Sequence, residues 1–246
     1  RGPVTLRIEG VAMVKNEADI IEAFVRHHLR LFDQLWVIDN VSTDQTREIL
    51  QALRDEGLPL RVTLEPRMPN PQQEVMTEVV TTWTGQIDWL FLLDADEFVD
   101  SPSREALVNV LSVLDPHSCY LVPWSYMVPT PQDDPSQPDP RLRITHRRDA
   151  PTPKYLSKVV LPSSLIGRPG LRVARGNHLL ESRSEITHTT LDTLSIAHFP
   201  IRSAQQLARK AVIGAWGAAS RNSRRAGEHH HFRTLRDSVL AGPGLT

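Results

Sequence analysis

The chain has little that could cross-link it or anchor it in a bilayer. Its 246 residues include one cysteine, Cys119, which excludes an internal disulfide and a zinc site built from cysteines. No apolar run approaches the roughly 20 residues that cross a bilayer, and the N-terminus lacks the pattern of a secretion signal. We therefore expect a cytoplasmic protein, which could also make peripheral contact with the inner face of the cell membrane.

Excess charge of either sign is also missing. Lys and Arg number 28 against 29 Asp and Glu, which leaves a formal net charge of -1. This balance provides no general attraction to nucleic acid, so we expect no nucleic-acid partner and only local anion binding. The basic residues are mostly arginines, and lysine occurs only at positions 15, 154, 158 and 210. A hydrophobic content of 40% is enough for a full core, and we expect one domain over residues 1–246.

The first half of the chain, residues 1–115, alternates strand-like and helical segments. Apolar runs at 11–14, 35–38, 60–64 and 89–93 predict strands, and helices are predicted after Asp19, after Thr43 or Asp44, over 72–83 and after Ser101-Pro102. This alternation is typical of an α/β protein with a mostly parallel, Rossmann-like sheet and helices on both faces. The fold class predicted is therefore α/β.

The second half, residues 116–246, has weaker periodicity. A strand is predicted at 119–124, and residues 129–140 contain too much proline for a helix or a central strand. Short strand-like runs at 158–161 and 194–197 precede a predicted helix over 203–216. We expect these segments to form a smaller region beside the main sheet.

An acidic cluster, residues 94–97, directly follows the apolar run at 89–93. Carboxylates this close raise one another's pKa unless a cation lies near them. In an extended chain Asp94 and Asp96 lie on the same side, so both could face Mg²⁺ or Mn²⁺, whereas Glu97 would point to the other face. A solvated acidic turn is the alternative interpretation.

Polar residues follow two further predicted strands. Residues 15–17 follow the first strand and residues 39–44 follow the second. Ligands bind beyond the carboxyl ends of parallel strands, so these residues and the acidic cluster should converge on one edge of the sheet. The edge would offer hydrogen bonds for a base or sugar and a metal for phosphate. A capped turn would also explain residues 39–44.

Three motifs, at residues 13–17, 37–46 and 92–98, resemble in their order and spacing the family 2 glycosyltransferases with the GT-A fold. The resemblance is closest to the branch with Asp-Ala-Asp-Glu-Phe, which includes many bacterial polysaccharide-assembly enzymes. It implies a GT-A fold and transfer of sugar from a nucleotide-diphosphate sugar to a saccharide or lipid-linked saccharide, with inversion at the anomeric carbon.

The resemblance also implies roles for single residues. Asp39 would hold the uracil or ribose, and residues 15–17 would lie against the nucleoside. A Mn²⁺ or Mg²⁺ ion would bridge the two phosphates of the donor. The donor-binding set comprises Lys15, Asn16, Glu17, Asp39, Ser42, Asp44, Asp94, Lys158, Asn177 and Arg202, and the metal-binding set comprises Asp94, Asp96 and His198.

The catalytic base is not identified by the sequence. An inverting transfer needs a carboxylate or imidazole that reaches the acceptor hydroxyl. The acidic pair of many family 2 enzymes is not evident, and Asp139, His178 and Glu181 are weak candidates that surface positions would also explain.

Two other functions use the same features. A Mg²⁺-dependent phosphohydrolase or nucleotidyltransferase could use the acidic cluster, although phosphohydrolases with Asp-x-Asp place it after the first strand, not the fourth. A non-catalytic nucleotide-sugar-binding module would explain the missing base. The Arg- and His-rich end, residues 221–231, suggests as a lesser alternative a contact with a phosphorylated lipid carrier or a membrane surface.

Overall fold

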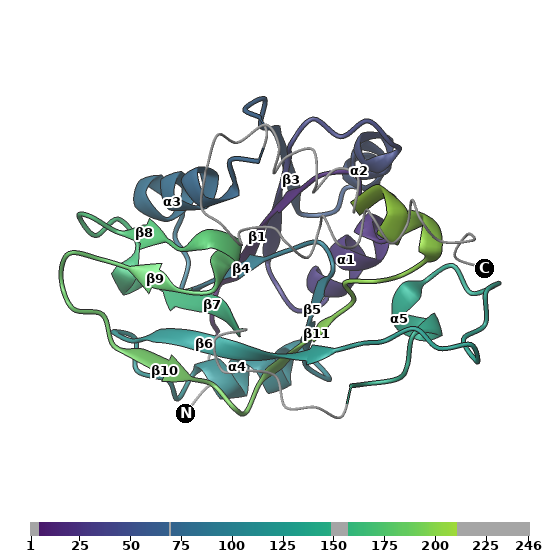
Figure 1. The fold of residues 1–246 in the computed structure, drawn as a ribbon. Helices are drawn as coiled ribbons and strands as arrows, with labels where there is room; N and C mark the ends of the chain where they lie inside the picture. Colours follow the sequence, from purple (N-terminus) through teal and green to yellow (C-terminus); the bar gives the residue numbers. More distant parts are fainter. Residues whose placement is uncertain (1–4, 69, 149–156, 211–246) are drawn as a thin grey trace, which may run out of the picture.

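The main feature of the protein is a large mixed sheet (Figure 1). A computed structural model describes residues 5–68, 70–148 and 157–210. The strands lie in the order β3, β2, β1, β4, β7, β6, β11 and β5, and β10 also pairs with β6. Their bounds are β1 Ile8–Val14, β2 Gln34–Asp39, β3 Leu60–Leu64, β4 Trp89–Leu93, β5 Glu97–Asp100, β6 Cys119–Tyr126, β7 Ser157–Pro162, β10 His188–Thr190 and β11 Ser195–His198. A second sheet consists of β8 (Arg172–Val173) and β9 (Leu180–Glu181).

The N-terminal part of the sheet is parallel, as the sequence predicts. Strand β1 lies between β2 and β4, and β2 pairs with β3. Val14 pairs with Asp39, so the polar segments that follow β1 and β2 begin level with one another. The carboxyl ends of β1, β2 and β4 therefore meet at one edge, where α/β proteins bind ligands.

Helices cover both faces of this sheet because its strands are apolar on both sides. In β4, Phe91 packs into one hydrophobic cluster and Leu92 into the other. Helices α1 (Ile21–His28), α2 (Thr46–Asp55) and α4 (Arg104–Leu111) contribute to the first cluster, and α3 (Gln72–Thr82) contributes to the second. The predicted α/β class, with a mostly parallel sheet and helices on both faces, is confirmed.

Contrary to the prediction, the described part of the second half does not form a separate region beside the main sheet but extends that sheet with both antiparallel and parallel pairs. Strand β7 pairs antiparallel with β4 and β6, and β11 pairs parallel with β6 and antiparallel with β5. The sequence did not predict β5, which begins at Glu97 inside the acidic cluster. The β5–β11 register places His198 opposite Glu97, so this pairing brings the second half of the chain to the acidic cluster.

Several local predictions differ from the structure. Helix α1 begins at Ile21 without a side-chain cap, and the carboxylate of Asp19 instead accepts hydrogen bonds from Arg202. Helix α4 is capped by Ser103, not by Ser101, because Oγ of Ser103 accepts a hydrogen bond from the amide of Ala106. The Pro-rich segment ends in a short helix, α5 (Pro140–Arg143).

The predicted helix over 203–216 begins at residue 204, and its part beyond residue 210 lies outside the described residues, as does the Arg- and His-rich end at 221–231. None of the helices in the described ranges has the length and apolar content needed to span a bilayer.

Close packing in the parallel sheet leads to a test of the fold. A Cβ atom added at Gly10 of β1 would lie 2.7 Å from Cε2 of Phe32, a buried ring that also packs against Phe91 at 4.9 Å between centroids. Because the ring cannot easily move, we expect Gly10→Ala to lower the free energy of unfolding by about 1–3 kcal/mol in urea denaturation. The control Val113→Ala, at a side chain 81% exposed, should change it by less than about 0.5 kcal/mol. Equal effects of the two substitutions would contradict this packing.

Candidate functional site

The acidic cluster is divided by a tight turn. Residues 95–96 form the turn, the amide of Glu97 donates to the carbonyl of Asp94 at 3.1 Å, and the amide of Asp94 donates to Oε2 of Glu97 at 2.9 Å. The expectation of an extended chain with Asp94 and Asp96 on one side is therefore wrong. The turn directs Asp94 and Asp96 to different partners.

Asp94 and Glu97 share one buried cation. The side chain of Lys158 is 0% exposed, and its Nζ lies 2.6 Å from Oδ2 of Asp94 and 3.1 Å from Oε1 of Glu97. The ammonium also donates to the carbonyl of Gly176 at 2.6 Å. Gln72, at the start of α3, donates to the other oxygen of Asp94 at 2.6 Å. Lys158 of β7 thus joins the acidic turn to the turn at Arg175–Asn177.

Burial and charge act in opposite directions on these groups. Burial lowers the pKa of Lys158, but the adjacent carboxylates of Asp94 and Glu97 raise it by more, so the ammonium stays charged. Burial raises the pKa of Glu97 well above its usual range, although Lys158 opposes this shift. The ammonium of Lys158 thus offsets part of the effect of burial on Glu97 while it also pairs with Asp94.

Asp96 faces a separate set of groups. Its Oδ1 lies 3.4 Å from Nε2 of His198, and its Oδ2 lies 2.9 Å from Nζ of Lys210 and 3.7 Å from Nη1 of Arg202. Burial acts to raise the pKa of Asp96, but the field of Lys210 and His198 holds it well below the usual range. Asp96 is thus an ionised carboxylate even though its side chain is only 6% exposed.

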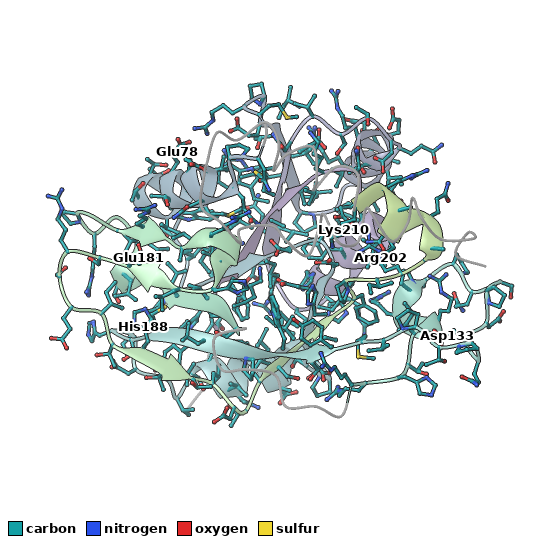
Figure 2. All side chains as sticks on the ribbon, in the orientation of Figure 1. Glu78, Asp133, Glu181, His188, Arg202 and Lys210 are labelled. Atoms are coloured by element: carbon teal, nitrogen blue, oxygen red, sulfur yellow. The ribbon has the colours of Figure 1, made fainter. Side chains whose placement is uncertain are left out.

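Arg202 connects the end of β1 to the segment after β11. Its Nη2 donates to Oε2 of Glu17 at 2.6 Å and its Nε donates to Oδ2 of Asp19 at 2.7 Å. Its side chain is 1% exposed, and Nη1 donates to the carbonyl of Phe199. Burial raises the pKa of Glu17 to about 7 against the opposing charge of Arg202. Figure 2 shows Arg202 and Lys210 together near the centre of the molecule.

The loops after β1 and β2 are joined by short hydrogen bonds. The amide of Asn16 donates to Oγ of Ser42 at 2.9 Å, and Oδ1 of Asn16 accepts from the amide of Thr43 at 2.7 Å. Both oxygens of Asp39, a buried residue, accept from the amide of Ser42. Val41 has a φ of 53°, which is an outlier for a β-branched residue. The hydrogen bonds of this region hold a strained backbone beside Asp39.

The remaining residues of these loops have mainly positioning contacts. Asp44 accepts from the amide of Ala18 at 3.2 Å and from Oγ1 of Thr46 at 2.5 Å, which joins the first loop to the start of α2. Lys15 donates to the carbonyl of Asn40 at 2.8 Å. The structure therefore brings residues 15–17, Asp39, Ser42 and Asp44 together at the predicted edge of the sheet.

Asn177 and His178 lie on the other side of Lys158. Asn177 is fully buried with a φ of 60°, and neither polar atom of its side chain has a hydrogen-bond partner among the described residues. Nδ1 of His178 lies 2.8 Å from the carbonyl of Ser157. The His178 ring lies 5.0 Å from that of Trp124, which itself lies 4.4 Å from the ring of His198. His178 thus reaches the site through Trp124.

The other two candidate bases have partners elsewhere. Asp139 caps α5 and pairs with Arg141 at 2.5 Å. Glu181 is exposed in β9, 4.0 Å from Nε of Arg172, beside a surface hollow of about 380 Å³ lined by residues 179–186 and His188. In Figure 2, Glu181 and His188 lie toward the left edge, away from Arg202 and Lys210. Among the three candidate bases, His178 is the one whose ring contacts Trp124, which in turn lies against His198.

Sequence reasoning missed three residues of this site: Gln72, Trp124 and Lys210. Gln72 lies at the start of α3, Trp124 in β6 and Lys210 in the helix that begins at residue 204. Each contacts an element that is distant in the sequence, and the residues around it do not indicate such a contact. The scarcity of lysine was the one usable indication for Lys210, because each of few lysines could be weighed singly.

The residues present fit a divalent cation at Asp96 and His198. Asp96, Glu97 and His198 each offer a ligand atom, and these atoms lie within 4.8 Å of one another. Glu97 fits less well, because Lys158 faces it and its pKa is raised. One carboxylate and one imidazole suit Mn²⁺, and Mg²⁺ commonly takes one or two carboxylates with phosphates and waters as its other ligands. Asp94 is separated from this set by its pairing with Lys158.

Removal of Lys158 tests the arrangement of the acidic turn. Lys158→Met leaves Asp94 and Glu97 without their buried cation, so we expect the free energy of unfolding to fall by about 3–5 kcal/mol. Glu97→Gln removes the neighbouring carboxylate and should lessen that loss. The double variant should therefore be more stable than the sum of the two single changes predicts in a urea-denaturation cycle. Strictly additive effects would show that Lys158 and Glu97 do not interact.

Comparison with known proteins places this site in a wider context. Residues 11–168 match the sequence model of "Glycosyl transferase family 2". No curated protein sequence matches the chain. The structure of TarS residues 1–349 from S. aureus is 13% identical, with a TM-score of 0.51 over 96% of this chain and 71% of that one. This is a likeness of fold.

Two other solved structures are less similar. TarS 1–349 in complex with UDP gives a TM-score of 0.49 at 14% identity, over 96% of this chain and 71% of that one. A mannosyltransferase from Pyrobaculum calidifontis, in complex with GDP-Man and Mn²⁺, gives 0.39 at 21% identity, over 53% of this chain and 37% of that one.

Proposed function

Because the chain belongs to glycosyl transferase family 2 and is thus a nucleotide-sugar-dependent glycosyltransferase, we propose that its activity depends on a divalent metal and inverts the anomeric carbon. The observation that carries this proposal is the position of ionised Asp96 3.4 Å from His198, at the edge of the sheet where the loops after β1, β2 and β4 meet. A Mn²⁺ or Mg²⁺ ion held there would neutralise the charge that develops on the departing diphosphate.

The nucleoside is assigned to the loops after β1 and β2. Asp39 is buried and already accepts from the Ser42 amide, so its carboxylate is fixed in orientation before a base or ribose arrives. The hydrogen bonds between Asn16 and residues 42–43 fix the two loops relative to each other. Such preorganisation reduces the entropy that binding must overcome.

Asp94 is assigned to the donor sugar or ribose and not to the metal. Lys158 and Gln72 each donate a hydrogen bond to one oxygen of Asp94, yet 30% of the Asp94 side chain stays exposed. Each carboxylate oxygen has a second lone pair that can accept from a hydroxyl. Lys158 therefore orients Asp94 while it keeps the local charge low.

His178 is assigned as the general base. Since a carbonyl only accepts hydrogen bonds, the contact to Ser157 places the proton of the imidazole on Nδ1 and leaves a lone pair on Nε2. Burial lowers the pKa of His178, which keeps the ring neutral near pH 7 and able to take a proton from an acceptor hydroxyl. Asp139 and Glu181 are held by arginines, so their geometry favours a structural role.

The cellular role rests on the motif resemblance. We propose an acceptor that is a saccharide or a lipid-linked saccharide in bacterial polysaccharide or glycoconjugate assembly, and a location in the cytoplasm with peripheral contact to the inner face of the membrane. We also propose one domain over residues 1–246, whose first half, residues 1–115, binds the nucleotide sugar and whose second half, residues 116–246, binds the acceptor. The β5–β11 pairing supports this division, since it joins the two halves at the site.

Substitution of Asp96 tests the metal assignment. Incubated with Mn²⁺ and a panel of UDP-, GDP- and dTDP-sugars, the wild type should hydrolyse or transfer sugar from at least one donor. In Asp96→Asn the loss of the charged ligand should abolish metal-dependent donor binding in calorimetry. Asp100→Asn, an exposed change at the other end of β5, is the matched control and should bind like the wild type.

An unchanged donor affinity in Asp96→Asn would remove Asp96 from the site. Wild-type protein that binds no donor of the panel would contradict the proposed activity. Release of inorganic phosphate from simple phosphate esters would favour a phosphohydrolase, and donor binding without turnover across acceptors would favour a non-catalytic module.

A further inference from the structure

Three cations border the acidic cluster, and their hydrogen-bonding states differ. Lys158 is 0% exposed, and its ammonium donates to Asp94 and to the carbonyl of Gly176 and forms an ion pair with Glu97 at 3.1 Å. With no exposed surface, this ammonium has no open direction toward a ligand. It holds the protein's own groups in place.

Arg202 is similarly committed. Its side chain is 1% exposed, and its Nε, Nη1 and Nη2 atoms all donate to Glu17, Asp19 or the carbonyl of Phe199. Nη1 also lies 3.7 Å from Oδ2 of Asp96, so this buried guanidinium offers little open surface to a diphosphate. The sequence predicts that Arg202 binds the donor, whereas the contacts in the structure position Glu17 and Asp19 around the site.

Lys210 differs from both. Its ammonium lies 2.9 Å from Oδ2 of Asp96, which is the one hydrogen bond it makes within the described part of the chain. The side chain is 39% exposed, and two of its three ammonium donors make no hydrogen bond within the described residues.

We propose that Lys210 binds the diphosphate of the donor and neutralises the leaving group together with the metal. The inference rests on the proposed function, because the cation site at Asp96 and His198 defines where the diphosphate lies. A phosphate oxygen on a cation held by Asp96 would come within reach of an ammonium that already touches the same carboxylate. Lysine binds phosphate as a point charge and needs no fixed geometry.

Charge balance supports an exchange of partners. Asp96, Glu17 and Asp19 surround the two cations Arg202 and Lys210. A divalent ion held by Asp96 would supply the positive charge that Lys210 now places beside this carboxylate, and the ammonium would then be able to pair with a phosphate oxygen. Lys210 lies in the helix that begins at residue 204, so the helix would carry a donor contact into the site from the second half of the chain.

The experiment compares wild type, Lys210→Gln and Lys210→Arg with Arg209→Gln, an exposed neighbour on the same helix, as the matched control. UDP, GDP and dTDP, and the nucleosides uridine, guanosine and thymidine, are titrated in the presence of Mn²⁺ by calorimetry. We expect Lys210→Gln to weaken binding of the nucleoside diphosphate about 10- to 100-fold, the range of one charge-assisted hydrogen bond. The affinity for the nucleoside should not change, Lys210→Arg should restore part of the loss, and Arg209→Gln should bind like the wild type.

Three results would overturn the proposal. Lys210→Gln could bind the diphosphate as tightly as the wild type. It could lose affinity for nucleoside and diphosphate equally, which would indicate a general structural effect. It could bind Mn²⁺ more tightly, measured by electron paramagnetic resonance without nucleotide, and the diphosphate more tightly as well, which would make Lys210 only a competitor of the metal. A wild type that binds none of UDP, GDP and dTDP would instead refute the proposed function, and the role of Lys210 with it.

Discussion

The buried ion pair between Lys158 and Asp94 is the interaction on which the geometry of the site depends. The three carboxylates of residues 94–97 lie around one tight turn directly after β4, and without a cation they would repel one another. Lys158 holds Asp94 and Glu97 on one side of that turn, so Asp96 is left to face the other side. The same ammonium donates to Gly176, which fixes the neighbouring turn of the second half. A buried pair of this kind adds little net stability, but loss of one partner is costly.

A second constraint is the pairing of β5 with β11. Strand β5 starts at Glu97, so the strand register is set by the same turn that separates the carboxylates. The register places His198 opposite Glu97, with its Nε2 3.4 Å from Asp96, and the segment that follows β11 brings Arg202 and Lys210 to the site. Burial of these charges makes their mutual attraction strong, which explains why Asp96 stays ionised with 6% of its side chain exposed. One backbone pairing thus assembles a site from residues over a hundred positions apart.

The sequence predicted the parallel sheet and the edge where the site lies, but not how the site is connected. Strands at 60–64 and 89–93 could be located to the residue because their apolar runs end at clear boundaries. The turn at 95–96 could not be predicted, because an extended chain satisfied the same sequence pattern. Lys158 carried only a weak signal, and its pairing with Asp94 spans 64 positions that no local periodicity links. Contacts of this range depend on strand order, which the sequence alone did not show.

The division of the acidic cluster is the central claim, and a crystal structure with Mn²⁺ and a bound nucleoside diphosphate tests it most directly. The account predicts an anomalous manganese peak within coordination distance of Asp96 and His198, with Asp94 still hydrogen-bonded to Lys158. A peak on Asp94, with the Lys158 ammonium displaced from it, would contradict the account.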